Sequence, residues 1–530
     1  MKFLRLIVLL FCVPAIAVGQ EAPAAGQTVL VVPFENQSKA PGIEWIGDSF
    51  PELLQERLNS PTLYVLPRED RLRAYDRLGI PVRVRPSRAT TYRMAEQMDV
   101  DYVVLGGYNF DGQTFSVKAQ LLDMRRPRLL PEIEESGSLV QLIDIQTALS
   151  WDILHGLYPG LTATRSAFLA EAPPVRLDAF ESYVKGVIAT TSEQQIQYFR
   201  EAVRLSPEYT AASLRLGEAY YREARYEPAI VWLSRVSQAN SHSGEANFYL
   251  GLAAYYEGDF PRAESSFDAV AQRLPLPEIY NNLGVVLDHR ERKLAVADFQ
   301  KAVADDPNDA DYRFNLAVEL YRNGDRAGAA RQLRESLALR ENDPEAKSLL
   351  SALDDTPDQH SVVPASSKIP MERLRTDYDE NSFRQLALKI AAAAEQRLSP
   401  SDAATHALFH VDRGHQLLLQ GFLTEAEREF REAIALNPSN AEAHAGLAAA
   451  LEVGDPTAAR SEAGAALRLH PFAEPFLVLA RLDLRDNKAA AAGQEVDQAL
   501  RLEPGNPAAL ALKNAVAAKL AQEAPPLPNR

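Results

Sequence analysis

The chain has 530 residues, of which 46% are hydrophobic and 24% are charged, a balance typical of folded proteins that excludes a chain disordered throughout. The net charge of −16 argues against a nucleic-acid partner, because phosphate recognition needs a cluster of basic side chains. It argues equally against an anionic membrane surface as the partner.

The first 19 residues have the features of a secretory signal peptide. Two basic residues precede an apolar run over 6–13, and the small residues at 15–17 fit a cleavage site. The run is too short to cross a bilayer in the mature protein. Since the only cysteine, Cys12, lies inside this segment, we expect a mature chain with no disulfide and no cysteine-bound zinc. A cysteine-free exported protein fits a bacterial periplasm.

Residues 26–160 alternate strand and helix patterns, which predicts a small α/β domain with a sheet of four or five strands. Asp111-Gly112 stands between two strand patterns and predicts a hairpin. The expected strands are 29–32, 63–66, 102–105 and 115–121, and the expected helices are 45–58, 90–98 and 141–157.

Several short segments of this domain resemble the TolB N-terminal-type domain, which is also found in FlgO-like envelope proteins. They are Val32-Pro33-Phe34-Glu35-Asn36, Trp45-Ile46-Gly47-Asp48, Leu53-Leu54, Val65-Leu66-Pro67-Arg68, the run from Val100 to Gly106 and the run from Ala119 to Asp123. The resemblance implies a protein-interaction domain of the bacterial envelope without catalysis. In bacteria such a domain often precedes helical repeats.

The rest of the chain contains an internal repeat. Leu216-Gly217, Leu250-Gly251, Leu283-Gly284 and Leu316-Ala317 recur 33 or 34 residues apart, and each is followed by a small and then a large apolar residue. This pattern resembles the tetratricopeptide repeat, a helix–turn–helix unit that buries its apolar face by stacking on its neighbours. The resemblance predicts an all-α solenoid after the α/β domain.

The repeats fall into two blocks. We expect a first array over 175–354, a linker over 355–370, a helical connector over 371–400, a second array over 403–522 and a tail over 523–530. Together the two arrays hold about seven or eight units.

The resemblance also implies which residues line the concave groove of the first array. They are Tyr221, Arg222, Phe248, Tyr255, Tyr256, Asn281, Asp288, His289, Phe314, Tyr321 and Arg322. Tyrosine and arginine are frequent binding hot spots, so this groove suits an extended peptide or a helix. The alternative is that several of the aromatic residues pack between repeats.

The equivalent positions of the second array are mostly apolar. They are Leu408, Val411, Ala445, Ala449, Leu477 and Leu484. Large exposed apolar patches are uncommon, so we favour intramolecular cover, for instance by the connector, over an amphipathic helix from a partner.

The chain offers little that could carry chemistry. It has no glycine-rich phosphate loop and no His-Glu-x-x-His motif. Ser49 sits in a partial nucleophile elbow in which Pro51 replaces the required glycine. His406 and His410 have helical metal-ligand spacing, but packing explains them better. Residues 377–381 resemble the start of a calcium loop and are better explained as a helix cap.

These observations predict a protein that is not an enzyme and needs no cofactor, no metal and no catalytic residue. We expect a periplasmic or secreted scaffold that binds proteins or peptides of the cell envelope through its grooves. The alternative is a ligand-sensing or cryptic hydrolytic role of the α/β domain. The oligomeric state stays open.

Overall fold

The computed structural model describes residues 27–60, 63–82, 84, 86–158, 164–170, 172, 174–236, 242–290, 292–354, 373–380, 382–383, 385–386, 402–419 and 423–523. The predicted signal peptide, the predicted linker over 355–370 and nearly all of the predicted tail lie outside the described residues. Within the described part, no helix is both long and apolar enough to cross a membrane.

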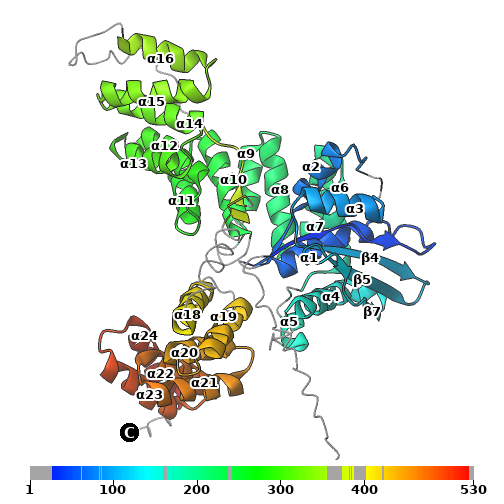
Figure 1. Cartoon of the computed structure of the whole chain (residues 1–530). Helices are drawn as coiled ribbons and strands as arrows, with labels where there is room; N and C mark the ends of the chain where they lie inside the picture. Colours follow the sequence, from blue (N-terminus) through cyan, green and yellow to red (C-terminus); the bar gives the residue numbers. More distant parts are fainter. Residues whose placement is uncertain are drawn as a thin grey trace, which may run out of the picture.

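The first part of the chain is the predicted α/β domain (Figure 1). Its elements are β1 Gln27–Val31, β2 Glu35–Asn36, α1 Ile46–Leu58, β3 Leu63–Val65, α2 Arg68–Arg77, α3 Arg88–Gln97, β4 Tyr102–Phe110, β5 Phe115–Asp123, β6 Arg128–Leu129, β7 Ile133–Gly137, η1 Leu139–Gln141, α4 Leu142–Leu157 and α5 Arg165–Ala170. The four predicted strands are confirmed, whereas the two-residue strands β2 and β6 and the half-polar β7 were not predicted, so the sheet has seven strands and not four or five.

The sheet has the order β3-β1-β4-β5-β6, with β2 also paired to β4 and β7 to β5. Strand β1 runs parallel to both β3 and β4, while β4 and β5 form an antiparallel hairpin. The predicted turn closes this hairpin: Gly112 takes a φ of +98°, and the Asp111 carboxylate accepts the amide of Thr114 at 2.8 Å.

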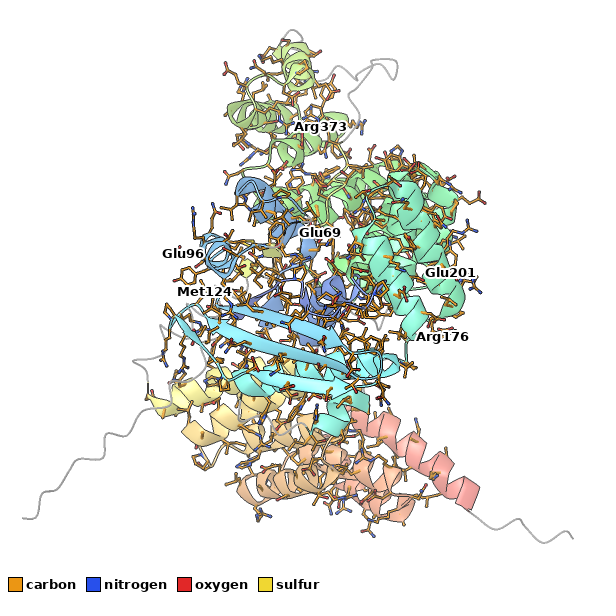
Figure 2. The ribbon with its side chains drawn as sticks, turned by 90° about the vertical axis from the view of Figure 1, so that its right-hand side faces the viewer. Glu69, Glu96, Met124, Arg176, Glu201 and Arg373 are labelled. Carbon is orange, nitrogen blue, oxygen red and sulfur yellow. The ribbon has the colours of Figure 1, made fainter. Side chains whose placement is uncertain are left out.

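Helices cover both faces of this sheet. Val29 and Val31 pack toward α1 and α4, whereas Leu30 and Val32 pack toward α2 and α3. This explains the unbroken apolar run of β1, because a strand covered on both faces has no solvent side. Figure 2 shows α3, which carries Glu96, above the strands.

Eleven helices follow as the first array, called array 1 here. They are α6 Leu177–Ile188, α7 Ser192–Leu205, α8 Thr210–Arg222, α9 Tyr226–Leu233, α10 Ser243–Tyr256, α11 Phe260–Ala271, α12 Pro277–Arg290, α13 Arg292–Asp305, α14 Ala310–Arg322, α15 Arg326–Leu339 and α16 Pro344–Asp354. Up to α15 they form antiparallel pairs, in which the first member is helix A and the second helix B, and α16 closes the end (Figure 1).

Array 2 repeats this arrangement in the last quarter of the chain. Its helices are α18 Ala403–Leu419, α19 Leu423–Leu436, α20 Ala441–Leu451, α21 Pro456–Leu469, α22 Ala473–Arg485, α23 Ala489–Leu502 and α24 Pro507–Glu523. The fold class predicted from the sequence, a small α/β domain followed by an all-α solenoid in two blocks, is confirmed.

The repeat signature has a direct steric cause. A Cβ added to Gly284 on α12 would lie 2.7 Å from the ring of Phe299 on α13. Gly251 on α10 faces Phe267 on α11 in the same way, at 2.8 Å. The missing side chain therefore lets helix B approach helix A closely enough to bury its aromatic ring, and this contact recurs along the array.

The α/β domain and the start of array 1 share one hydrophobic core. The ring of Trp45, just before α1, meets the ring of Phe180 on α6 edge to face, with centroids 6.2 Å apart. The Tyr183 hydroxyl lies 3.4 Å from the Glu52 carboxylate on α1. These contacts make the sheet and the first repeats one packed unit.

The structure corrects one expectation about the connector. Residues 373–379 are extended and not helical, although the apolar spacing of 371–400 predicts helices. Helical residues begin only at Glu380, and 387–400 lie outside the described residues. The extended conformation comes from contacts that the segment makes with array 1.

Candidate functional site

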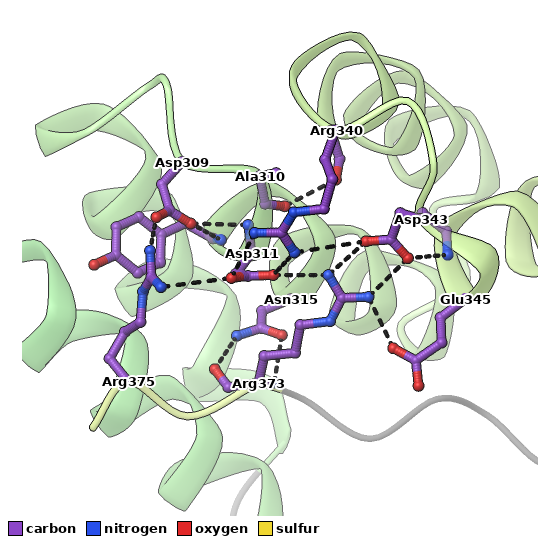
Figure 3. Close-up of polar contacts among 12 residues, drawn as sticks. Asp309, Ala310, Asp311, Asn315, Arg340, Asp343, Glu345, Arg373 and Arg375 are labelled. Carbon is purple, nitrogen blue, oxygen red and sulfur yellow. Dashed lines mark hydrogen bonds and ion pairs between the residues drawn. The ribbon is translucent and has the colours of Figure 1, made fainter. Parts of the chain in front are cut away.

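The candidate site is the concave surface of array 1 together with a segment of the same chain that lies in it. We call this segment, Arg373–Glu380, the strap. Its partners come from α10, α12, α14 and the start of α16, and Figure 3 shows the part of the site around Arg373 and Arg375.

Side-chain amides of the groove bind the main chain of the strap. Asn282 is bonded twice to Arg375: its Nδ2 donates to the carbonyl at 2.7 Å, and its Oδ1 accepts the amide at 2.8 Å. Asn315 makes the same pair of bonds to Arg373, both at 2.8 Å. Asn281 donates to the Arg373 carbonyl as well, at 2.9 Å. These bonds recognise an extended backbone and do not depend on which side chains the bound segment carries.

The three asparagines are fully buried. They lie on helix A of two successive repeats, where Asn315 Nδ2 also donates to Asn281 Oδ1 at 2.7 Å. Burial of a side-chain amide without partners costs free energy, and here the strap supplies the missing donors and acceptors. The amides and the extended chain therefore satisfy one another.

Arg373 enters an acidic pocket at the outer end of the groove. Its guanidinium forms two parallel bonds to Asp343, at 2.7 and 2.9 Å, and further bonds to Asp311 at 2.7 Å and Glu345 at 2.8 Å. Its planar group stacks over the Phe314 ring, 3.8 Å from the centroid. Bidentate pairing and stacking both require the flat guanidinium of arginine.

The second arginine of the strap, Arg375, uses neighbouring carboxylates. It pairs with Asp309, reaches Asp311 at 3.5 Å and lies over the Tyr312 ring at 5.0 Å. Hydrogen bonds from Arg340 and Arg373 outweigh the effect of burial and hold the pKa of the Asp311 carboxyl below its usual value. The pKa of Asp343 is also lowered, chiefly by its bonds from Arg373.

The other end of the strap is anchored by an aromatic contact. The Tyr378 ring lies 5.2 Å from the Phe248 ring on α10, and its hydroxyl fits against Gly244, where a Cβ would overlap it. The amide of Asp379 donates to Glu278 Oε1 at 3.0 Å. Burial raises the pKa of this glutamate.

Asp379 also shows the structural role of the acidic run at 377–381. Its carboxylate accepts the amide of Ser382 at 3.1 Å, as a helix cap does. This agrees with the cap interpretation of that run.

Three of the eleven predicted groove residues contact the strap: Phe248, Asn281 and Phe314. The others lie elsewhere on the helices. Tyr221, Tyr255 and Tyr256 form a half-exposed aromatic cluster with Tyr226 and His289, in which the Tyr226 and Tyr256 rings stack at 4.8 Å and Tyr255 Oη lies 3.3 Å from His289 Nε2. The aromatic residues were expected either to line the groove or to pack between repeats. The rings of this cluster do both, since they pack on one another across repeats and are still partly exposed.

The remaining predicted groove residues either form ion pairs or lie beside charged side chains. Arg322 pairs with Asp288 at 2.7 Å, beside the buried Glu319. Arg222 pairs with Glu218 on its own helix, and Tyr321 lies near the Arg326 guanidinium. The Arg322–Asp288 pair joins two groove helices, α14 and α12, and none of these contacts involves the strap.

Sequence reasoning missed Asn282, Asn315, Asp311 and Asp343, which carry most of the polar contacts. One signal was available, because Asn282 and Asn315 are 33 residues apart, as Leu283 and Leu316 are, and each directly precedes the signature leucine of its repeat. Buried asparagines in register on successive helices A indicate a row of amides facing the groove.

The apolar positions of array 2 divide between core and surface. Val411, Ala445 and Leu477 are buried among the helices of the array, whereas Leu408 is 53% exposed. We expected the connector to cover this surface, but its described part lies in the groove of array 1. The rest of the connector lies outside the described residues.

The weaker candidates for chemistry have structural partners. His410 is buried, and its Nδ1 lies 2.8 Å from the Glu429 carboxylate. Although burial acts in the opposite direction, this bond and nearby arginines lower the pKa of Glu429 to about 2. Ser49 lies inside α1 and donates to the Ile46 carbonyl at 2.8 Å. The described residues contain no cluster of three or more His, Cys, Asp or Glu side chains that could hold a metal.

A second hollow lies between the α/β domain and the start of array 1. It has a volume of about 1390 Å³ and is bordered by α2, by β4 and β5, and by α6, α7 and α8. Basic side chains on its wall include Arg68, Arg71, Lys118, Lys185, Arg215 and Arg222, and acidic ones alternate with them. Of these, Arg71 is almost fully buried and donates to the Val31 carbonyl at 3.0 Å.

Comparison with known proteins assigns the repeats. Two family models, both described as tetratricopeptide repeat, match this chain, one over residues 289–368 and the other over 196–244, 248–294 and 411–473. The repeat signature predicted from the sequence is confirmed, whereas the TolB-like resemblance of the first domain stays a prediction. No curated relative matches the chain.

The solved structures that are similar to part of this chain include the following three. MamA from Desulfovibrio magneticus RS-1 shares 20% identity over 29% of this chain and 88% of that one, with a TM-score of 0.27. YrrB, described as a TPR protein with an unusual peptide-binding site, shares 16% identity over 34% of this chain and 93% of that one, with a TM-score of 0.30. The LpoB C-terminal domain from Salmonella enterica shares 13% identity over 22% of this chain and 87% of that one, with a TM-score of 0.20. Similarities at this level carry no argument about function.

Proposed function

We propose that this chain, which carries tetratricopeptide repeats, is a non-enzymatic scaffold that binds extended segments of partner proteins in the groove of array 1. One observation carries the proposal: Asn282 and Asn315 bind the amide and the carbonyl of alternate strap residues. Main-chain recognition of this kind accepts an extended segment of any protein, and flanking side-chain pockets then select the sequence.

The test is a selection of random peptides displayed on phage against the full chain, in which the substitutions Arg373→Glu, Arg375→Glu and Tyr378→Ala release the strap. We expect enriched peptides whose binding is lost when Asn282→Ala and Asn315→Ala are added. Asn308→Ala, at an exposed asparagine in the α13–α14 turn, is the matched control. Enrichment that ignores the two groove asparagines would contradict the proposal.

We further propose that the protein works outside the bacterial cytoplasm, in the envelope. The signal-like first 19 residues, the location of the only cysteine at Cys12 and the TolB-like segments of the first domain support this. A fusion of residues 1–26 to a phosphatase that is active only after export should give activity. An inactive fusion that is nevertheless expressed would contradict export.

The hollow between the α/β domain and array 1 supports a second candidate role, namely ligand sensing by the first domain. Its volume suits a small molecule, and it lies beside the carboxyl ends of β1 and β3, where α/β sheets commonly bind ligands. A metabolite screen by thermal shift with the full chain tests this role. Hits that Arg71→Met abolishes would favour it, whereas hits indifferent to that change would not.

A further inference from the structure

We infer that the strap is a replaceable occupant that closes the groove of array 1 to partners, and that the partner is an extended protein segment with the strap's own chemistry. That chemistry is two arginines separated by one residue, with a tyrosine three residues after the second. The inference rests on the proposed function and names both the partner class and its regulation.

The strap is bound as a ligand is bound. Six hydrogen bonds join groove side chains to its main chain. Its two arginines enter neighbouring acidic sites that share Asp311, and its tyrosine packs against α10 at the other end. A segment that only filled the core would instead bury an apolar face, and of its side chains only Leu374 and Tyr378 pack at the edge of the apolar core of the central repeats.

The array does not need the strap for its own core. The buried apolar residues of α10 to α16 come from the helices themselves, and strap residues join them only as partly buried neighbours. Release of the strap would therefore expose polar and acidic groove atoms, which water can solvate, and leave the helix packing in place.

The charge of the groove selects the partner. Asp309, Asp311, Asp343 and Glu345 surround the two arginines, and Arg340 is the basic side chain that the described contacts place among them. The paired geometry at Asp343 fits a guanidinium and not an ammonium group. An acidic side chain in place of either arginine would meet repulsion from these carboxylates, so the groove selects a segment by the charge at these two positions.

Covalent attachment gives the strap an advantage over any free segment. A tethered segment competes at an effective concentration on the order of millimolar. A free peptide with the same contacts should therefore bind the native chain roughly tenfold to a hundredfold more weakly than a chain whose strap has been disabled. A natural partner must exceed the strap in contacts or in local concentration.

Fluorescence anisotropy with a labelled peptide of residues 373–380 tests the inference on the full chain. The opened variant carries Arg373→Glu, Arg375→Glu and Tyr378→Ala, and it should bind at least roughly tenfold more tightly than the native chain. The further changes Asn282→Ala and Asn315→Ala should remove that binding. The matched control, Arg200→Glu with Arg331→Glu, alters two exposed arginines on helices B and should behave as the native chain. A peptide with both arginines replaced by lysine should bind roughly tenfold more weakly to the opened variant.

Equal affinity of the native and opened chains would overturn strap closure, while the proposed function would stand. Binding of selected library peptides without binding of the strap peptide would overturn the partner chemistry alone. If a folded opened chain binds neither kind of peptide, the proposed function of array 1 fails as well. Should the opened variant lose its helical circular dichroism, the smaller change Arg373→Glu with Tyr378→Ala replaces it, because both substitutions lie in the strap and leave the groove that the peptide occupies unchanged.

Discussion

Asn282 holds both main-chain polar groups of Arg375, the carbonyl at 2.7 Å and the amide at 2.8 Å. A single buried side chain on α12 thereby fixes the strap in an extended conformation and sets its register in the groove. Each such bond contributes about 1 kcal/mol net, so loss of the pair should be measurable in the exchange between a bound and a released strap.

Asn282→Ala should therefore release the strap more often. With two bonds removed, the released fraction should rise about 30-fold, as expected for about 2 kcal/mol. Trypsin cleaves after arginine and needs an open chain, so cleavage after Arg373 and Arg375 should accelerate by a similar factor. Mass spectrometry of the new termini measures cleavage after Arg373 and Arg375 separately from cleavage at other trypsin sites. Asn308→Ala should leave both rates unchanged, and equal rates for Asn282→Ala and the native chain would show that this asparagine does not hold the strap.

Gly284→Ala tests the steric origin of the repeat signature. The new Cβ would lie 2.7 Å from the Phe299 ring, so α12 and α13 must separate. We expect a loss of stability of about 1–3 kcal/mol in denaturant unfolding. The matched change Gly156→Ala on α4 meets no atom within 4 Å and should be neutral or slightly stabilising. A similar small effect of both changes would contradict the close-packing explanation.

The repeats could be predicted because their signature reflects contacts within one unit. Gly284 and Phe299 are neighbours within one unit, as Gly251 and Phe267 are in the unit before it, so residue types at a fixed spacing report the packing directly. The strap could not be predicted in this way. The helical spacing of Phe383, Leu386, Leu388 and Ile390 predicted helices over 371–400, and Phe383 and Leu386 are helical. At 373–375, however, asparagines distant in sequence bind the main chain, and these tertiary contacts take the place of a helix.

The same distinction applies to the candidate site. Phe248, Asn281 and Phe314 were predicted because the family pattern fixes the inward face of helix A. Asp311 and Asp343 were missed, since they act at the starts of α14 and α16, outside that pattern. Carboxylates near helix starts are usually explained by capping, and here they also bind the strap.

Phe180→Ala should destabilise the sheet and array 1 together. Phe180 is 3% exposed and packs against Trp45, so its loss should cost about 3–5 kcal/mol. Because the two regions share one core, hydrogen exchange of amides in β1 and in α8 should accelerate by similar factors. Leu477→Ala in α22 of array 2 is the control and should leave both sets of amides protected. Faster exchange in α8 alone would show that the α/β domain folds independently.

Glu319→Gln should remove a pH dependence of stability. Burial, together with a hydrogen bond to Asp288 and the charge of that aspartate, raises the pKa of Glu319 from its usual 4.5 to about 7. Below pH 4.5 the carboxyl is protonated in both the folded and the unfolded chain, so it carries no penalty there. Between pH 4.5 and 7 the unfolded chain ionises this carboxyl while the folded chain keeps it protonated, so the native protein loses stability as pH rises over that range, and the loss is complete above pH 7.

The neutral amide of Glu319→Gln avoids that ionisation and still can donate toward Asp288. The variant should therefore exceed the native chain at pH 8 by on the order of 2 kcal/mol and nearly equal it at pH 5. Other shifted groups, such as Glu245 with its pKa raised by burial to about 6, are common to both proteins and cancel in the difference. Urea unfolding at the two pH values measures this difference, with the exposed Glu341→Gln as control. A stability difference that is the same at both pH values would place the proton elsewhere in the Asp288–Glu319–Arg322 group.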